Sequence, residues 1–252
     1  MRLLTWVVIL FSVATKGLEN LSQLDTFRGI ASQSSSYYST SRYNADKAVD
    51  GILEDAGGEE TCSITVGNHG EEEAWWKLPF KQMSNVAYLE IYFRSSTVNR
   101  HVGFSVFVFN NSAYIPPSNP SQHKVFTHNP SKCLERVTNV TINKVTQGIA
   151  LYNPKEPTSR TVCRGFEPNF ATIEVCEVNV MGCPSKHYGD NCTLCDVKCR
   201  DRQCDAFNGS CIYGCSETVT ETPYCSGKRH VFLIICICNV WVIRERVNLR
   251  LR

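Results

Sequence analysis

Fourteen cysteines are the most reactive side chains of this 252-residue sequence, and their spacing is uneven. Eight of them lie in the 43 residues from Cys183 to Cys225, whereas the preceding 182 residues carry only four. A segment this short cannot bury enough apolar surface to fold alone, so the density predicts a module held together by disulfides in an oxidising compartment. Cys192 and Cys195 also have the spacing of zinc ligands, but a secreted chain favours disulfides.

The histidines show none of the arrangements that catalysis would need. No two of them have paired metal-ligand spacing, and no nucleophile motif accompanies any of them. The set consists of His69, His101, His123, His128, His187 and His230. The net charge of +2 gives no indication of a nucleic-acid surface. The sequence therefore predicts a protein that is not an enzyme and that has no nucleic-acid partner.

The N-terminus predicts entry into the secretory pathway. Arg2 precedes the apolar run Leu3–Val13, and small residues follow at Ala14 and Gly17. This order describes a cleaved signal peptide, which we place at residues 1–17. A membrane anchor would need roughly 20 apolar residues. The protein is therefore expected to be secreted or displayed at the cell surface.

Five Asn-x-Ser/Thr triplets are candidate acceptors for N-linked glycans. In a secreted chain such triplets mark surface positions that can carry a glycan. The five asparagines are Asn20, Asn110, Asn139, Asn191 and Asn208.

The C-terminal residues 228–252 contain one short apolar segment. Residues 231–243 are apolar except for Asn239, and basic residues flank them on both sides. A helix of that length would span about 20 Å, short of the ~30 Å hydrocarbon core of a bilayer. An interfacial or aggregation-prone tail, or an error at the gene end, fits at least as well as a membrane span, so membrane association stays open.

Residues 18–182 have the periodicity of a β-sheet protein. From Ala87 to Phe93, apolar residues at odd positions alternate with Tyr and Glu, which is the period-2 pattern of a half-buried strand. Further β-rich segments lie at 103–109, 137–145, 148–152 and 172–180. The first of these is apolar on both faces and is expected to be a central strand. Many short strands with irregular links predict an all-β protein with a β-sandwich fold.

The last of these segments changes face along its length. Ile173 and Val175 place the apolar face on odd positions, yet Cys176 and Val178 place it on even ones. A regular strand cannot do both, so we expect a β-bulge near Cys176 and Glu177. The bulge would re-aim the side chain of Glu177.

Five short motifs follow one another in the order found in one lectin family. They are Asp50-Gly51, Thr61-Cys62, Trp75-Trp76-Lys77-Leu78, Phe93-Arg94 and Cys176-Glu177-Val178-Asn179-Val180. With these motifs, residues 18–182 resemble the fucolectin-type (F-type) lectin domains of the wider discoidin-like, galactose-binding group. The resemblance implies a jelly-roll β-sandwich that recognises carbohydrate.

The segment that follows resembles a second family. Cys183-Pro184, Tyr188-Gly189 and the cysteines up to Cys215 are similar to laminin-type EGF-like repeats of invertebrate multiple-EGF-like-domain, scavenger-receptor-like proteins. The resemblance implies a small EGF-like module at residues 183–227. The similarity ends after Cys215, where the sequence lacks the Gly-Tyr-x-Gly turn of that family.

The two resemblances together imply a disulfide pairing for twelve of the cysteines. The pairs are Cys62–Cys176, Cys133–Cys163, Cys183–Cys192, Cys195–Cys204, Cys199–Cys211 and Cys215–Cys225. The first of them would close a loop of more than 100 residues, for which the chain-entropy model gives about 4.7 kcal/mol. Cys236 and Cys238 would stay unpaired.

The fucolectin resemblance also implies a sugar site. Members of that family hold sugar hydroxyls with one histidine and two arginines, whose forked donors suit neighbouring oxygens. Arg94 and Arg100 stand at the matching places, but Ile64 occupies the position of the histidine. Residues 95–99 also lack the adjacent cysteine pair of the family. A site that lacks one polar anchor discriminates less well between sugars. An equally good interpretation is that the two arginines are ordinary charged residues of a surface loop.

A structural calcium ion is the third implication of the resemblance. Fucolectins hold the ion with the loop around the Asp-Gly pair and with the glutamate after the last cysteine. The matching ligands are Asp50, Thr61, Cys176 and Glu177, through carboxylate or other oxygens that suit a hard cation. Lys47 departs from the amide residue usual in that loop. The alternatives are an ordinary turn at Asp50 and a solvated strand end at Glu177.

Two functions therefore remain open at the level of sequence. The first is a secreted or cell-surface recognition protein, a calcium-binding and lectin-like receptor fragment whose partners are glycans or cell-surface glycoproteins. The second is a scavenger-receptor-like adhesion module that uses the same β domain for protein contacts without binding sugar.

Overall fold

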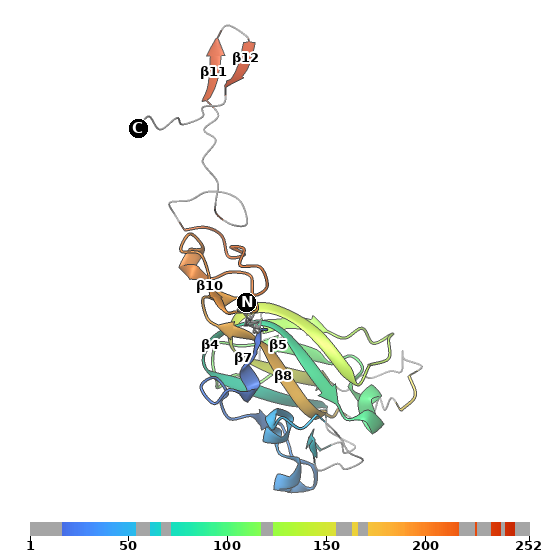
Figure 1. The fold of residues 1–252 in the computed structure, drawn as a ribbon. Coiled ribbons are helices and arrows are strands. Elements are labelled where there is room, and N and C mark those ends of the chain that lie inside the picture. Colours follow the sequence, from blue (N-terminus) through green and yellow to red (C-terminus); the bar gives the residue numbers. More distant parts are fainter. Residues whose placement is uncertain are drawn as a thin grey trace, which may run out of the picture.

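The computed structural model describes residues 17–53, 61–66, 72–116, 123–154, 163–165, 171–216 and 225, and the backbone of 233–237 and 240–244. Strands dominate these parts of the chain, and short 3₁₀ helices lie in the links (Figure 1). The strands of the main body are β1 (Glu19–Asn20), β2 (Ser32–Gln33), β3 (Ser63–Ile64), β4 (Glu73–Phe93), β5 (Ser105–Val108), β6 (Lys124–Thr127), β7 (Val137–Pro154) and β8 (Glu174–Pro184). The 3₁₀ helices are η1 (Leu21–Gln23), η2 (Tyr37–Ser39), η3 (Ser41–Tyr43), η4 (Ala45–Val49), η6 (Ser95–His101) and η7 (Arg200–Arg202).

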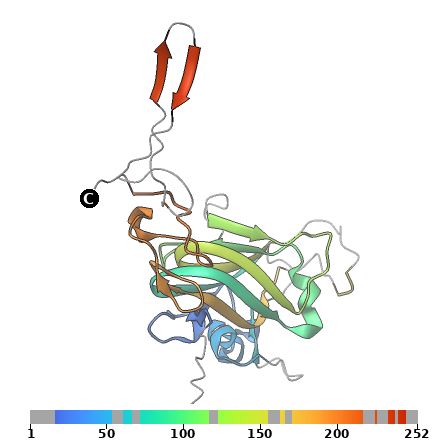
Figure 2. The same ribbon diagram turned by 45° about the horizontal axis from the view of Figure 1, so that its top comes forward.

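The main body is an antiparallel arrangement in the order β1-β8-β4-β7-β5-β6, with β2 added on β4 and β3 on β8. The long strands β4 and β7 pair with each other, but their register breaks between Pro79 and Ser84. Register breaks of this kind bend the strands. The second half of β4 pairs with β8, and the second half of β7 pairs with β5. The curved strands wrap around one core (Figure 2), which confirms the predicted all-β sandwich.

Every second residue of the long strands contributes its side chain to the core, because successive side chains on a strand point to opposite faces. Its fully buried members include Trp76, Leu78, Leu89, Ile91, Phe93, Val106, Ile149, Leu151, Val178 and Val180. The predicted strand Ala87–Phe93 is the second half of β4. The segment expected to be central, 103–109, contains β5, which lies between β6 and β7. Segments 137–145 and 148–152 are both strand, as expected, and they belong to the single strand β7, which bends at its register breaks without ending.

The predicted bulge in the last strand is confirmed by the pairing of β8 with β4. Tyr92 is opposite Glu177 and Phe93 is opposite Val175, so Cys176 is an additional residue on β8. The extra residue lets Val175 and Val178 both face the core although they are three positions apart. Glu177 consequently points away from the core cluster and toward the loop after η4.

The cysteine-rich segment 183–216 follows β8 and contains a second small sheet. In it, β9 (His187–Tyr188) pairs with β10 (Thr193–Leu194). The structure contains the disulfides Cys62–Cys176, Cys133–Cys163, Cys183–Cys192, Cys195–Cys204, Cys199–Cys211 and Cys215–Cys225, the same six pairs that the resemblance implies. Five of these cysteines, joined by Tyr188, form the apolar interior of the segment. Sulfur bridges thus supply the packing that so short a chain otherwise lacks.

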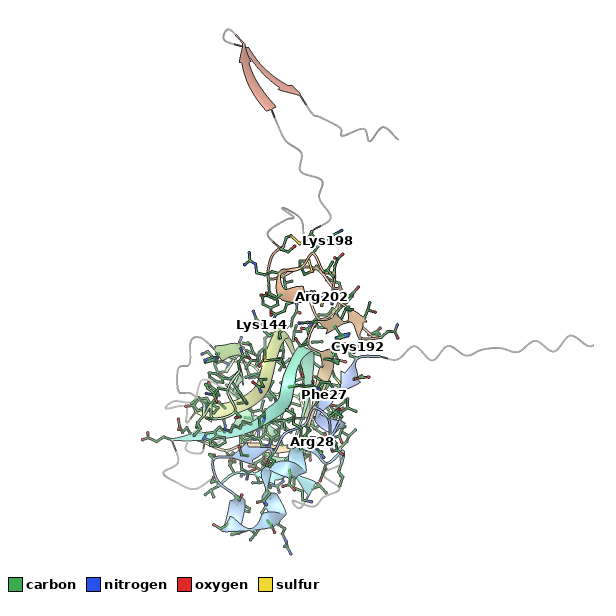
Figure 3. The ribbon with its side chains drawn as sticks, turned by 90° about the vertical axis from the view of Figure 1, so that its left-hand side faces the viewer. Phe27, Arg28, Lys144, Cys192, Lys198 and Arg202 are labelled. Carbon is green, nitrogen blue, oxygen red and sulfur yellow. A yellow bond between two sulfur atoms is a disulfide. The ribbon has the colours of Figure 1, made fainter. Side chains whose placement is uncertain are left out.

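Hydrogen bonds fasten the cysteine-rich segment to one end of the sandwich, a region called the junction below. The amide of Asn85 on β4 is 1% exposed and donates to the carbonyls of His187 and Cys204, each at 3.0 Å. Asn143 on β7 donates to the carboxylate of Asp205 at 2.6 Å. In Figure 3, Lys144 and Cys192 lie near this boundary, and Lys198 lies at the far end of the segment.

The apolar stretch 231–243 contains β11 (Leu233–Ile237) and most of β12 (Val240–Arg244), which pair with each other in antiparallel orientation. No helix among the described residues is long and apolar enough to cross a bilayer. The predicted signal peptide, apart from Gly17, lies outside the described residues, as does Cys238.

Candidate functional site

The two predicted sugar-binding arginines lie where β4 ends and converge on one acid. Arg94 is the N-cap of η6 and Arg100 lies in its last turn. Each places Nη1 at 2.9 Å from the carboxylate of Glu174 on β8, Arg94 on Oε2 and Arg100 on Oε1. The hydroxyl of Thr97 also donates to Oε2, at 2.8 Å. The structure therefore brings the predicted pair together, around a carboxylate that sequence reasoning did not identify.

Glu174 is an ionised group in the protein interior. Its side chain is only 3% exposed, and burial alone would raise its pKa. The Thr97 hydroxyl and the Arg100 guanidinium oppose burial, and the pKa of this carboxyl lies below its usual value. The acid therefore stays charged at neutral pH. It fixes the two guanidinium groups, whose side chains remain 18% and 30% exposed.

His101 completes this cluster from within the core. Its ring is fully buried and stacks on Phe93 at 4.8 Å between centroids. Nε2 accepts a hydrogen bond from the backbone N–H of Glu174 at 2.8 Å, and Nδ1 lies 3.0 Å from the carbonyl of Val98. A nitrogen that accepts from an N–H carries no proton, so this is a neutral ring with its hydrogen on Nδ1. Burial lowers the pKa of His101, in agreement with that tautomer.

Ile64, at the position of the family's histidine, is a core residue in this chain. It is 3% exposed and packs with Tyr43, Cys62 and Cys176. Its partner across β3 and β8 is Glu174. The place where the resemblance implies a polar anchor is therefore apolar and closed, and the polar groups at this end of the sandwich come from Glu174 and its arginines.

A second acid, Glu177, is the centre of the predicted calcium set. Its side chain is fully buried. Oε2 accepts the backbone N–H of Gly51 at 3.0 Å, and Oε1 accepts from the amide of Gln23 at 2.8 Å. Gly51 has φ of +85°, which suits glycine, and this turn brings the neighbouring Asp50 to the glutamate. The structure thus joins two of the predicted ligands across 127 residues of sequence.

The environment of Glu177 favours a neutral carboxyl. Burial is the main cause and the negative charge of Asp50 adds to it, so the pKa of Glu177 rises to about 7 despite the hydrogen bond from Gly51. The positive charge of Arg28 opposes this rise, and its Nη1 donates to the carbonyl of Val49 at 2.6 Å. The ammonium of Lys47 lies 3.8 Å from Asp50. Two carboxyl groups held together in this way suit a divalent cation.

The remaining predicted ligands meet at a disulfide. Thr61 precedes Cys62, which is bonded to Cys176, and Cys176 directly precedes Glu177. The four predicted ligands therefore lie on three described pieces of backbone, two of which the disulfide joins. Among the described residues, no group of three His, Cys, Asp or Glu side chains gathers into a metal site. Any cation here would consequently depend on backbone and hydroxyl oxygens besides the two carboxylates.

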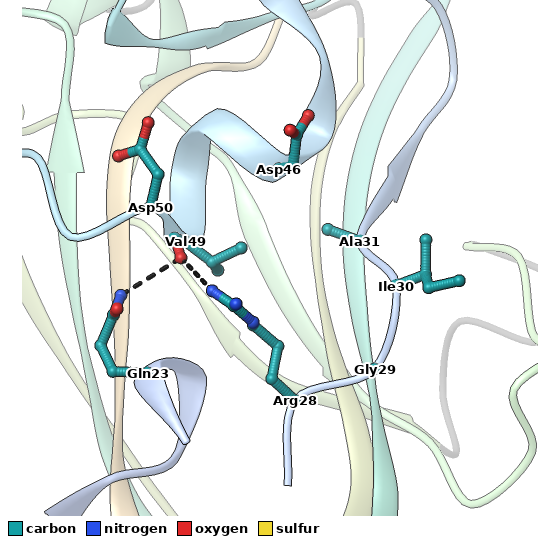
Figure 4. Close-up of a pocket in the computed structure, with 8 residues that line it drawn as sticks. All are labelled: Gln23, Arg28, Gly29, Ile30, Ala31, Asp46, Val49 and Asp50. Atoms are coloured by element: carbon teal, nitrogen blue, oxygen red, sulfur yellow. Dashed lines mark hydrogen bonds between the residues drawn. The ribbon is translucent and has the colours of Figure 1, made fainter. Parts of the chain in front are cut away.

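A pocket of about 510 Å³ opens beside Asp50 (Figure 4). Figure 4 shows Gln23 and Arg28 both reaching toward the carbonyl of Val49, with Ile30 on the opposite side. The lining residues are Gln23, Arg28, Gly29, Ile30, Ala31, Asp46, Val49 and Asp50. Asp50 and Gln23, which both belong to this lining, are the residues that connect the pocket to the buried Glu177.

The candidate glycosylation sites differ in accessibility. Asn110, Asn139, Asn191 and Asn208 are exposed. Asn20 is half-buried, and its amide donates to Asn179 at 2.7 Å and accepts from the N–H of Val180. A glycan at Asn20 would have to emerge beside these bonds, whereas the other four positions face solvent.

Sequence reasoning missed Glu174 and His101, although each carried a signal. Glu174 interrupts an apolar strand, and an acid buried in a strand needs cationic or hydrogen-bonding partners. The arginines already singled out are those partners. His101 directly precedes the largely buried stretch Val102–Phe109, and this position in the sequence is a signal that its own side chain is buried.

The fold is shared with a known lectin structure. The fucolectin from striped bass (Morone saxatilis) serum superposes with a TM-score of 0.51 and 18% identity, over 67% of this chain and 50% of that chain. The protein thus spans about half the length of that lectin. A fucose-binding module of Streptococcus pneumoniae aligns with a TM-score of 0.46 and 18% identity, over 65% of this chain and 97% of the module. No protein-family model and no curated protein matches the sequence.

Proposed function

We propose that the protein is an extracellular carbohydrate-binding module of the lectin type, which holds glycans at the arginine pair Arg94 and Arg100. The observation that carries the proposal is the convergence of both guanidinium groups on Glu174 at the loop end of a fucolectin-like sandwich. A fixed pair of forked donors can bridge neighbouring sugar hydroxyls at low entropic cost. The six disulfides support an oxidising, extracellular setting. Residues 183–227 would act as an EGF-like stalk.

The second candidate is a protein-adhesion module without sugar affinity. Ile64 favours it, because an apolar and buried residue occupies the place of the family's histidine. A glycan array separates the two candidates. Binding of the purified protein to a defined set of fucosylated glycans supports the lectin, and an array without signal at millimolar calcium favours protein adhesion.

Arg94→Ala should weaken glycan binding at least tenfold. Hydrogen bonds to charged groups contribute about 1.5–3 kcal/mol, and each 1.4 kcal/mol corresponds to a factor of ten. Titration calorimetry with L-fucose measures the change. Arg94→Lys should lose a similar amount, because it keeps the charge but not the fork. The matched control is Arg202→Ala on the cysteine-rich segment, which should bind as the parent does. Equal affinities for all variants would place the sugar elsewhere.

We also propose that Asp50 and Glu177 hold a structural calcium ion, completed by oxygens of Thr61 and Cys176. The support is the fully buried Glu177, whose pKa is raised by burial and by the charge of Asp50, together with the pocket that Asp50 lines. An ion there would neutralise two charges that the fold keeps close together. Its role would be to fix the η4 loop against the bulge in β8.

Calcium should raise the melting temperature more at pH 8 than at pH 5.5. The pKa of Glu177 is raised to about 7, so without metal its contribution to stability is greatest below about pH 4.5 and is lost as pH rises through 7. Calcium binds the ionised form and restores that loss. Thermal scans with calcium or chelator measure the effect. Glu177→Gln should remove the response and Asp190→Asn, at an exposed acid, should keep it. An equal response at both pH values would count against this site.

A further inference from the structure

His101 is a core residue whose side chain holds the backbone of Glu174. The ring lies between β4 and β8, stacked on Phe93, and is fully enclosed. Its Nε2 accepts the N–H of Glu174 at 2.8 Å. The same residue holds both arginines through its side chain. The backbone position of Glu174, and with it the placement of the arginine pair, is therefore supported by a bond that His101 makes only while its ring is neutral.

Protonation would turn this attraction into a clash of two donors. A protonated ring carries N–H on both nitrogens, so Nε2–H would face the N–H of Glu174. Among the described residues, the charged groups that face the ring are Glu174 from β8 and Arg100 from η6. Glu174 attracts the imidazolium, but its carboxylate is already shared with Thr97 and two arginines. A charged His101 would compete with those guanidinium groups for the same oxygens.

We propose that His101 is a positioning residue that makes the arginine pair acid-labile: protonation breaks its bond to Glu174, draws the carboxylate toward the ring and releases a bound glycan. This inference rests on the proposed carbohydrate site, and it adds a pH range in which that site is dismantled. Glycan is retained at neutral pH and released once the pH falls below the pKa of His101, which burial holds below its ordinary value. The ligand remains a glycan, as in the proposed function, and the new element is the pH-dependent control of its release.

The experiment compares the parent with His101→Gln in steps from pH 7.5 to pH 4, in saturating calcium. Glutamine offers an amide oxygen to the N–H of Glu174 and an amide N–H to the carbonyl of Val98, and it does not titrate. L-fucose affinity by calorimetry should fall at least tenfold over this range for the parent and less than threefold for His101→Gln. The control His187→Gln, in the cysteine-rich segment, should behave as the parent.

A second measurement does not need the variant to fold or the sugar to bind. In ¹⁵N-labelled parent protein, the amide resonance of Glu174 should shift as the His101 ring titrates. A Glu174 amide that stays constant down to pH 4, or a His101→Gln variant that loses affinity as steeply as the parent, overturns the inference. Absence of binding at pH 7.5 instead refutes the proposed function, while the amide titration still tests His101.

Discussion

The double variant Cys62→Ala with Cys176→Ala should lose about 4–5 kcal/mol of unfolding free energy, the largest effect we expect. The bond joins residues 114 positions apart, and the chain-entropy model gives about 4.7 kcal/mol for a loop near 100 residues. Both cysteines are buried, and alanine is the replacement because serine would place a hydroxyl in the core. Urea titration followed by tryptophan fluorescence measures the change. The same variant should lose its calcium response, because the bond holds Thr61 against Cys176 and Glu177.

The control for this prediction is the pair Cys133→Ala with Cys163→Ala. Its residues are 30 positions apart, so its removal should cost roughly 1 kcal/mol less by the same model. It also lies outside the proposed calcium set and should leave the calcium response intact. Equal losses from the two double variants, or a calcium response that survives without Cys62 and Cys176, would contradict the prediction.

Glu174→Gln should have two effects: it should destabilise the protein by about 3 kcal/mol and it should weaken glycan binding. Removal of one partner of a buried ion pair typically costs about 3–5 kcal/mol, and the lower end applies because Arg94 and Arg100 are partly exposed. Two guanidinium groups would then repel each other without the acid between them. Urea titration at pH 7 measures the stability, and calorimetry with L-fucose measures the affinity.

The pH dependence gives an independent check of this variant. The pKa of Glu174 is lowered in the folded protein, so its stabilisation is present at neutral pH and is lost as pH falls below the ordinary carboxyl range. The stability difference between parent and Glu174→Gln should therefore shrink on acidification. Glu135→Gln, at an exposed acid, should match the parent throughout. A Glu174→Gln variant as stable as the parent at pH 7 would show that the ion pairs contribute nothing net.

Local patterns were sufficient to predict much of the sandwich. The alternation over Ala87–Phe93 predicted strand β4, because one face of it is buried against a core. The change of face around Cys176 predicted the bulge, since side chains on a strand must alternate. These features depend on residues within a few positions of one another, which is why the sequence reveals them.

The site depended on contacts that no local pattern encodes. Glu174 meets Arg94 and Arg100 across more than 70 positions, and the direction of each side chain is set by tertiary packing. The fucolectin resemblance identified the two arginines but could not supply the buried acid between them. The junction was missed for the same reason. Asn143 has a positive φ of 47° at a register break in β7, and its amide reaches Asp205 only because of that local turn.

The junction decides how mechanical load passes through the molecule. Asn85 lies at the start of the second half of β4, and Arg94 directly follows the last residue of the strand, nine positions later or about 30 Å at ~3.3 Å per residue. The arginine pair and the cysteine-rich segment therefore lie toward opposite ends of this half of the strand. Tension between a captured ligand and that segment would run parallel to β4 and shear its ladders with β7 and β8. Strand-to-strand hydrogen bonds that are loaded in shear share the force and break together. The protein should therefore withstand a high force along this axis and then unfold in one step.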